Sequence, residues 1–371
     1  YTKLISQIKT EITLHNDNII TNKLKSLNIK NNSLWNAVKM SKKSNNNIPT
    51  LNTDTGPIFN KTEKANAIAN NFETIHKLTN NSSDQETIKE VNIKYLHLIN
   101  DNLDRNAIPF VTPSEVMKAI KTTKSKKAAG HDKIQNIVLK QLPKKLIVQI
   151  AYIFTACLTY SYLPYTWKHA IILPFPKPGK DKTNPKNYRP ISLLCTLGKI
   201  LEIIINRRLK IFADKNNILI AEQFGFRAQH STVQQLARVT DFISSNFNKN
   251  KSTGLLLLDI EKAFDTVWHR GLIYKMINHN IPKYIIRFVD NYLKGRTFAV
   301  KINNSLSKTC NIAAGVPQGS ILGPILFLLY INDIPKYTKN VIALFADDTA
   351  ILSSSWSKDV ILQNFGGCSN V

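Results

Sequence analysis

The stretch VIALFADDTAIL, residues 341–352, constrains the fold of this 371-residue chain more than any other. Its two apolar runs, Val341 to Phe345 and Thr349 to Leu352, predict the two antiparallel strands of a hairpin. Asp347 and Asp348 would then lie at its tight turn. Two adjacent carboxylates on an apolar hairpin are costly unless something neutralises them, and a pair of divalent metals would do so. Aspartate is also common in ordinary β-turns, and this stretch alone slightly favours that simpler interpretation.

A second apolar run, Gly254 to Asp259, also ends in a carboxylate. Its continuous leucines predict a central strand that is buried on both faces. If this strand neighbours the Asp-Asp hairpin, three carboxylates converge. Hard divalent cations such as Mg²⁺ take carboxylate oxygens together with substrate phosphates, and two such ions can hold the attacking and leaving oxygens of phosphoryl transfer. Taken alone, Asp259 would more simply cap the turn after its strand.

The charge of the chain points to a polyanionic partner. It has 50 Lys plus Arg against 25 Asp plus Glu, a net charge of +25. Nucleic acid is the leading candidate, and an anionic membrane surface is the second. The longest apolar run, Ile321 to Ile331, is too short to span a membrane and contains Gly323 and Pro324, so no membrane partner is expected. Four scattered cysteines form no CxxC pair and indicate the reduced thiols of an intracellular protein.

Four further residues fit chemistry on a nucleotide. Lys177 and Arg189 flank a basic loop between two predicted strands and could grip a triphosphate, although an ordinary solvated loop would look the same. Phe264 could stack under a sugar, or it could be a core aromatic. Gln318 lies in the glycine-bounded loop GVPQGS, whose backbone could approach a nucleotide closely. The alternative for this loop is a helix-entry turn capped by Ser320.

The chain divides into two parts by composition. Residues 1–105 are rich in Asn, Lys and Ser and predict loosely packed helices on a basic linker. An organised region, 106–371, begins near Thr112, where TPSE predicts a helix start with a capping box; its core spans about residues 160–371. The run KTTKSKKAAG after that helix could contact phosphates through Lys126 and Lys127, or it could be a solvated helix end.

The ordered motifs resemble the reverse transcriptase domain of non-LTR retrotransposons, the jockey-like group in particular. The resemblance implies an α/β (α+β) right-hand polymerase of fingers and palm, with an antiparallel palm sheet backed by helices. It implies an RNA-directed DNA polymerase that adds dNTPs to a primer 3′ end. The matching stretches, in the family's order, are KKAAGHDKI, LPFPKPGKDKTNPKNYRPISLL, EQFGFRAQHST, LLLLDIEKAFDTVWH, AAGVPQGSILGPILFLLYINDIP and FADDTAIL.

This resemblance also implies cofactors, partners and a location. Asp259, Asp347 and Asp348 resemble the catalytic triad of the family, which binds two Mg²⁺ ions, or Mn²⁺ in their place. The implied partners are an RNA template, a DNA primer or target, and dNTPs. The implied location is the nucleus, where the primer is nicked chromosomal DNA, or a cytoplasmic ribonucleoprotein.

The other matched residues resemble the substrate and nucleic-acid contacts of the family. Phe264 looks like the steric gate that discriminates between sugars. Arg189 and Lys177 resemble triphosphate contacts of the fingers, and Gln318 resembles the residue that lines the nucleotide pocket. The stretch with Phe226 and Arg227 is similar to a template- or primer-contacting segment, and a structural role is favoured for Asp265 and Trp268.

The sequence departs from the family pattern at both ends. We expect a fragment of a longer protein, because the chain begins at Tyr1 rather than Met and shows neither an endonuclease before the domain nor a thumb after Leu362. Ala129 and Phe345 stand where the family often has Pro and where many members have Tyr. One alternative is therefore a catalytically inactive fragment that still binds nucleic acid. The other is a different palm-fold nucleotidyltransferase, such as an RNA-dependent RNA polymerase, and Phe264 speaks against it.

Overall fold

The computed structural model describes two compact units, Tyr1–Pro49 and Thr50–Val371. The first contains helix α1 (Thr2–Lys25). Residues 50–105, which the sequence predicts to be a linker, belong to the second unit, while the predicted boundary near residue 105 stays a prediction. The described residues are 2–25, 33, 48–53, 56–77, 85–337 and 340–366.

The first sheet of the second unit, here called the fingers sheet, has the strand order β4-β3-β6-β7, and β8 also pairs with β6. Strands β3 and β4 are the two strands predicted around the basic loop, and they pair as an antiparallel hairpin with Phe175 opposite Arg189. The β3–β6 pair is parallel. The strands are β3 (His169–Pro176), β4 (Tyr188–Leu193), β6 (Arg296–Ile302), β7 (Ser305–Leu306) and β8 (Cys310–Ile312).

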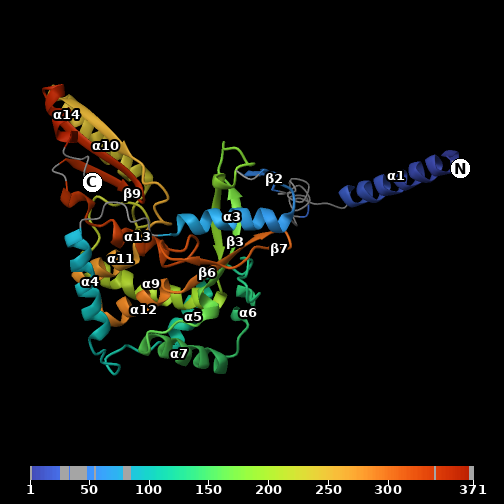
Figure 1. Ribbon diagram of the computed structural model, residues 1–371, viewed down its shortest axis with the longest axis horizontal. Helices are drawn as coiled ribbons and strands as arrows, with labels where there is room; N and C mark the ends of the chain where they lie inside the picture. The colour runs from blue at the N-terminus through green and yellow to red at the C-terminus, as the bar shows by residue number, and fades with distance from the viewer. Residues whose placement is uncertain are drawn as a thin grey trace. The chain divides into compact units, whose positions relative to one another are not determined.

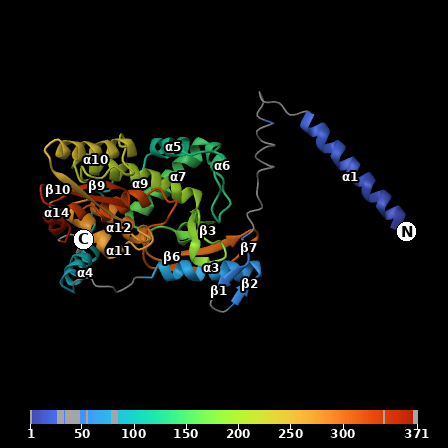
Figure 2. The ribbon, with the colours of Figure 1, turned by 90° about the horizontal axis from the view of Figure 1, so that it is seen from above.

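Helix α3 (Lys61–Ile75) lies along the fingers sheet and packs against β6, β7 and β8 (Figures 1 and 2). Asn60 caps it by accepting a hydrogen bond from the N–H of Thr62. The face that the helix buries carries Ala65, Ile68, Ala69 and Phe72. Just before it, β1 (Leu51–Thr53) and β2 (Gly56–Ile58) form a small hairpin. Residues N-terminal to the matched motifs therefore help to build the fingers.

The second sheet, here called the palm sheet, is antiparallel and has the order β5-β10-β9. It consists of β5 (Ser252–Leu258), β9 (Val341–Phe345) and β10 (Asp348–Ser355). The predicted hairpin is confirmed. Because Phe345 pairs with Asp348, only Ala346 and Asp347 form the turn, and Asp348 already belongs to the strand.

The prediction that β5 is a central strand buried on both faces is wrong. It is an edge strand, with Leu255 and Leu257 48% and 71% exposed. Leu256 and Leu258 point to the other face, where they pack against the core that contains Ile351. The leucine run misled because an apolar residue on the open face looks the same in sequence as one on a covered face.

Two helices flank the palm sheet. Helix α10 (Thr232–Phe247) contacts β5 and β9 and has Ser231 as its N-cap. Helix α14 (Lys358–Gly366) packs against β5 and β10, where Phe365 joins the small core of the sheet. The predicted palm of an antiparallel sheet backed by helices is thus present.

The remaining helices share one large hydrophobic core, to which α9 and α13 contribute many fully buried side chains. Among the described helices, none is both long and apolar enough to cross a membrane. These helices are α4 (Gln85–Asn100), α5 (Pro113–Thr122), α6 (Asn136–Lys140), α7 (Lys144–Thr159), α8 (Tyr165–Lys168), α9 (Thr196–Lys215), α11 (His269–Asn278), α12 (Lys283–Leu293) and α13 (Gly323–Tyr330).

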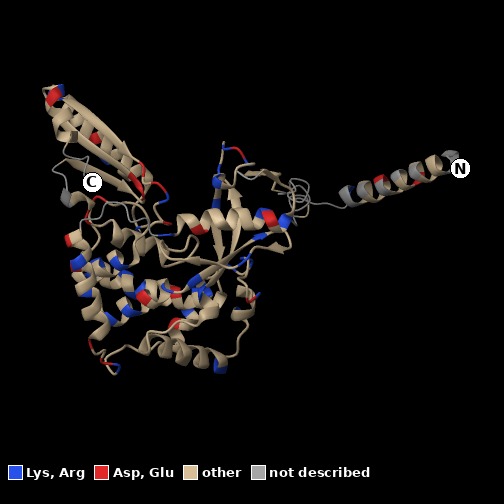
Figure 3. Ribbon diagram, viewed as in Figure 1, with Lys and Arg blue, Asp and Glu red and all other residues tan. Residues whose placement is uncertain are grey.

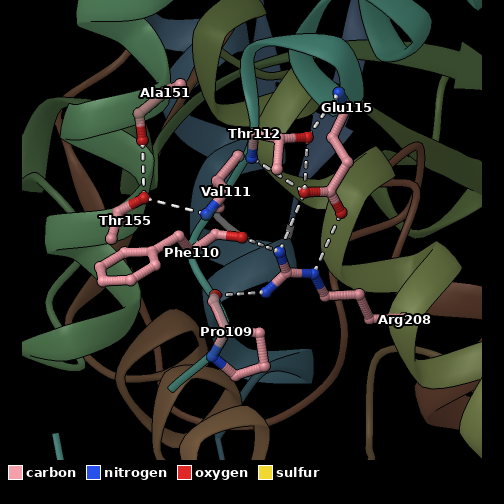
Figure 4. A network of polar contacts seen from close by, with 8 residues as sticks. All are labelled: Pro109, Phe110, Val111, Thr112, Glu115, Ala151, Thr155 and Arg208. Atoms are coloured by element: carbon pink, nitrogen blue, oxygen red, sulfur yellow. Dashed lines mark hydrogen bonds and ion pairs between the residues drawn. The ribbon is translucent and has the colours of Figure 1, made fainter. Parts of the chain in front are cut away.

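The start of α5 is joined to α9 by one arginine (Figure 4). The predicted capping box is confirmed, because Thr112 and Glu115 bond each other's backbone N–H groups. Arg208 of α9 donates from Nε and Nη2 to the two carboxylate oxygens of Glu115, at 3.2 and 3.1 Å. The same guanidinium also donates to the carbonyls of Pro109 and Phe110. The helix cap is therefore also a tertiary contact.

Candidate active site

A cavity of about 750 Å³ is lined by residues of both sheets and of α3. Its lining comes from the β3–β4 hairpin, the segment after β5, the loop before α13 and the β9–β10 turn. Most of the predicted site residues meet here although they lie far apart in sequence. Those that line it are Lys177, Arg189, Phe226, Asp259, Phe264, Gln318 and Asp347.

The three aspartates lie at the ends of neighbouring strands, as predicted. Leu258 pairs with Thr349, so the register places Asp259 opposite Asp348, one step beyond the last pair. Asp259 and Asp347 line the large cavity. Asp348 is exposed and lines a separate cavity of about 260 Å³ beside α10. The structure thus brings two of the carboxylates to one cavity. The third, Asp348, is the first residue of β10 and lines the other cavity.

The chemistry of these donors fits a hard divalent cation, since all three are carboxylates. In the part of the chain that the structure describes, none of the three makes an ion pair with Lys or Arg. Within the same described residues, no group of three or more His, Cys, Asp or Glu side chains stands close enough together to hold a metal ion. The ligand types therefore agree with the predicted metal site. The three carboxylates, however, do not stand close enough together in the structure to hold one ion between them.

Basic residues of the β3–β4 hairpin line the same cavity. Figure 3 shows how Lys and Arg are distributed along the ribbon of this hairpin. Lys177 and Arg189 were predicted, and Lys186 was missed, although its place in the basic loop KDKTNPKN was a usable signal. The loop is tied to residues before the motifs. Asn52 N–H donates to the Thr183 carbonyl at 2.8 Å, and Asn71 Nδ2 donates to the Pro185 carbonyl at 3.3 Å.

Phe264 is both a packed aromatic and a wall of the cavity. Its ring stacks on Phe327 with centroids 4.5 Å apart and meets Phe226 edge-on at 5.8 Å. These two aromatic contacts hold the ring in place. The core interpretation and the gate interpretation of the sequence are therefore compatible.

Asp265, for which a structural role was favoured, holds Gln318. Both of its carboxylate oxygens accept hydrogen bonds from Gln318 Nε2, each at 2.9 Å. Asp265 is 5% exposed. Burial raises the pKa of this carboxyl, and nearby His76 and the bond from Gln318 oppose that shift. Because Nε2 faces the carboxylate, the amide oxygen of Gln318 is the group left to accept a bond from a ligand.

The glycines of the GVPQGS loop serve close backbone contacts within the protein. Gly315 has φ +88°, and a Cβ there would lie 2.5 Å from the carbonyl oxygen of Asp265. A Cβ on Gly319 would lie 3.1 Å from the Ser192 carbonyl oxygen. Ser320 Oγ accepts from Gly323 N–H at 2.9 Å, as the helix-entry alternative predicts. The loop is thus a helix entry that also carries Gln318 into the cavity.

Known proteins are similar in sequence to this chain. Residues 175–365, about half of the chain, match the family described as "Reverse transcriptase (RNA-dependent DNA polymerase)". The chain belongs to the reverse transcriptase family.

Its relatives include polymerases of insect mobile elements. The chain is 42% identical to the "Probable RNA-directed DNA polymerase from transposon X-element" of Drosophila melanogaster, over 67% of this chain and 28% of that protein. It is 35% identical to the corresponding protein from transposon BS of the same fly, over 87% of this chain and 36% of that protein. It is 41% identical to the "RNA-directed DNA polymerase from mobile element jockey", over 67% and 28%. The chain spans about a third of the length of these curated relatives.

Three residues that were predicted to contact nucleic acid are not among the described residues that line the large cavity. Lys126 and Lys127 are exposed on a turn after α5 and are not among the described residues that line the cavity. Arg227 Nη1 donates to the carbonyls of Ile220 and Gln223, at 2.6 and 3.2 Å. Its charge therefore also holds its own loop together. Trp268 precedes α11 and packs closely on Gly271, which agrees with a structural role.

Proposed function

We propose that this chain is the polymerase core of an RNA-directed DNA polymerase from a jockey-like non-LTR mobile element. It adds dNTPs to a primer 3′ end along an RNA template. The observation that carries the proposal is the shared cavity, in which Asp259 and Asp347 meet Lys177, Lys186 and Arg189. Carboxylates that bind cations, next to basic groups that bind phosphate, are the parts that phosphoryl transfer needs.

Asp259, Asp347 and Asp348 would hold two Mg²⁺ ions, or Mn²⁺ in their place. When bound, such ions activate the primer hydroxyl and neutralise the charge of the triphosphate. The other steps belong to the side chains of the cavity. Lys177, Lys186 and Arg189 bind the phosphates, Phe264 packs under the sugar, and Gln318 accepts a bond from the nucleotide.

The charge of +25 supports an extended polyanionic partner, namely the RNA template and the DNA primer or target. Lys126 and Lys127 remain candidates for phosphate contacts because both are exposed. Synthesis primed on chromosomal DNA would take place in the nucleus, with a cytoplasmic ribonucleoprotein as the alternative. Salt dependence of RNA binding measures how many such contacts form.

Primer extension tests the function. A DNA primer on a homopolymer RNA template is incubated with dNTP and Mg²⁺, using the wild-type chain, Asp347→Asn and the matched control Asp359→Asn. Asp359 is an exposed aspartate in the first turn of α14. We expect Mg²⁺-dependent extension that falls on the order of 10³-fold in Asp347→Asn and is unchanged in the control.

The other outcomes separate the alternatives. RNA binding without extension by the wild-type chain would support an inactive fragment that still binds nucleic acid. Incorporation of NTPs in preference to dNTPs would support an RNA polymerase. If Phe264 discriminates between the sugars, Phe264→Ala relaxes the preference for dNTPs.

A further inference from the structure

The turn between β9 and β10 has an unusual backbone. Ala346, its first residue, has φ +59°, a left-handed conformation that residues other than glycine adopt rarely and at a cost. Asp347 follows it directly. Because rotation about the backbone of Ala346 would move the carboxylate of Asp347 relative to Asp259, the fold must fix this conformation.

Gln223 bonds both backbone groups of Ala346. Its Oε1 accepts from the Ala346 N–H at 2.9 Å, and its Nε2 donates to the Ala346 carbonyl at 3.2 Å. The same Oε1 accepts from the Gly225 N–H at 2.7 Å. Gln223 is only 2% exposed, so these bonds are sheltered from water. One side chain therefore pairs both polar groups of the strained residue.

The backbone around Gln223 is fitted to the same edge of the palm sheet. Phe224 N–H donates to the Leu344 carbonyl at 2.9 Å, and Leu344 N–H donates to the Glu222 carbonyl at 3.0 Å. A Cβ on Gly225 would lie 2.1 Å from the Ala346 nitrogen. Only glycine allows this approach. The segment thus covers the free edge of β9 and ends against the turn.

We propose that Gln223 is a positioning residue for DNA synthesis. It holds Ala346 in its left-handed conformation and thereby sets where Asp347 and Asp348 stand. The role of these carboxylates rests on the proposed function, but the contact between Gln223 and the turn does not. Gln223 is not among the described residues that line the cavity, so it acts through the backbone that it bonds, at Ala346 and at Gly225.

A neighbouring glutamine provides a matched control. Gln235 is also buried, at 6% exposure, and donates to the carbonyls of Glu222 and Leu344 at 2.9 and 3.0 Å. Gln223→Met and Gln235→Met each remove buried amide bonds at the edge of β9 with little change in volume. Only the first releases Ala346. Comparing the two variants separates positioning of the turn from general loss of stability.

Kinetics give the first readout. At a temperature where both variants are fully folded, we expect kcat to fall at least about tenfold in Gln223→Met and to stay within about twofold in Gln235→Met. KM for dNTP and Kd for the RNA–DNA duplex should stay within about twofold in both. Equal losses of kcat in the two variants, or a loss confined to KM, would overturn the proposal.

Amide hydrogen exchange gives a second readout that needs no activity. The Ala346 amide should exchange about tenfold faster, or more, in Gln223→Met than in Gln235→Met. Equal exchange of the Ala346 amide in the two variants would refute the proposal that Gln223 holds the turn. If the wild-type chain extends no primer, the proposed function fails, and the exchange experiment still decides whether Gln223 holds the turn.

Discussion

The two sheets present their functional residues in different ways. In the fingers, the β3–β4 hairpin is secured by bonds from the distant segment that contains Asn52 and Asn71. In the palm, the two backbone groups of Ala346 in the β9–β10 turn are bonded by a single side chain of the described structure, that of Gln223. Support that is spread over several contacts tolerates single substitutions better than a clamp made by one side chain. We therefore expect the palm to fail at single residues and the fingers to weaken gradually.

The side chains that the sheets carry suit these supports. Lys186 and Arg189 are exposed and long, so they can adjust to a phosphate over several ångströms. Aspartate is short, and its position follows the backbone that bears it. A site built from aspartates therefore needs a rigid turn. Long basic side chains that bind a phosphate do not need one.

Arg189→Ala is the largest effect expected from the fingers. Loss of a charge-assisted bond to phosphate should raise KM for dNTP about 10- to 30-fold, while kcat changes much less. Steady-state kinetics on an RNA template measure both constants. Lys182→Ala is the matched control, because Lys182 is exposed on the same hairpin and does not line the cavity in the described structure. Equal increases of KM in the two variants would show general charge attraction instead of a specific contact.

Asp265 connects the two regions, because it follows the palm strand β5 and holds Gln318 beside the fingers strand β4. If it acts through Gln318, Asp265→Ala and Gln318→Ala should each raise KM for dNTP about tenfold or less. The double variant should be no worse than either single variant, since both remove the same interaction. A double-mutant cycle on KM measures this coupling. Additive effects would mean that Asp265 has a separate role.

The features that the sequence predicted are local. The β9–β10 hairpin follows from two apolar runs around a turn, and the start of α5 follows from Thr112, Pro113 and Glu115 within one helical turn. The resemblance to the family then predicted the site residues, and most of them line the one cavity. Their metal and substrate roles stay predictions that the proposed experiments test.

The features that the sequence did not predict depend on contacts between distant segments. Gln223 lies 123 residues from the turn that it bonds, and nothing in its own neighbourhood points to that partner. The apolar face of α3 was visible, but the sheet that it covers begins more than 90 residues later, so the helix was assigned to a linker. The edge position of β5 was hidden because its leucines alternate between a covered face and an open one.

Glu115→Gln should lower the stability of the fold without affecting the functional residues of either sheet, because Glu115 lies at the α5–α9 contact (Figure 4). Its side chain is 26% exposed, so solvent screens part of its attraction to Arg208. We expect the substitution to lower the free energy of unfolding by about 1 kcal/mol at neutral pH. Neither kcat nor KM should change when the protein is fully folded. Glu63→Gln, in the exposed first turn of α3, is the control.

The pKa of Glu115 determines how this difference in the free energy of unfolding depends on pH. Burial tends to raise the pKa of Glu115, but the bonds from Arg208 and Thr112 outweigh it, and the pKa in the folded protein lies below the ordinary value of 4.5. The carboxylate therefore stabilises the fold above the unfolded pKa, and that contribution is lost as the pH falls through the lowered folded pKa. Urea unfolding from acidic to neutral pH should show the wild type losing its advantage over Glu115→Gln below about pH 4.5. A difference that is constant with pH would show that the lost stability comes from packing and not from the charge.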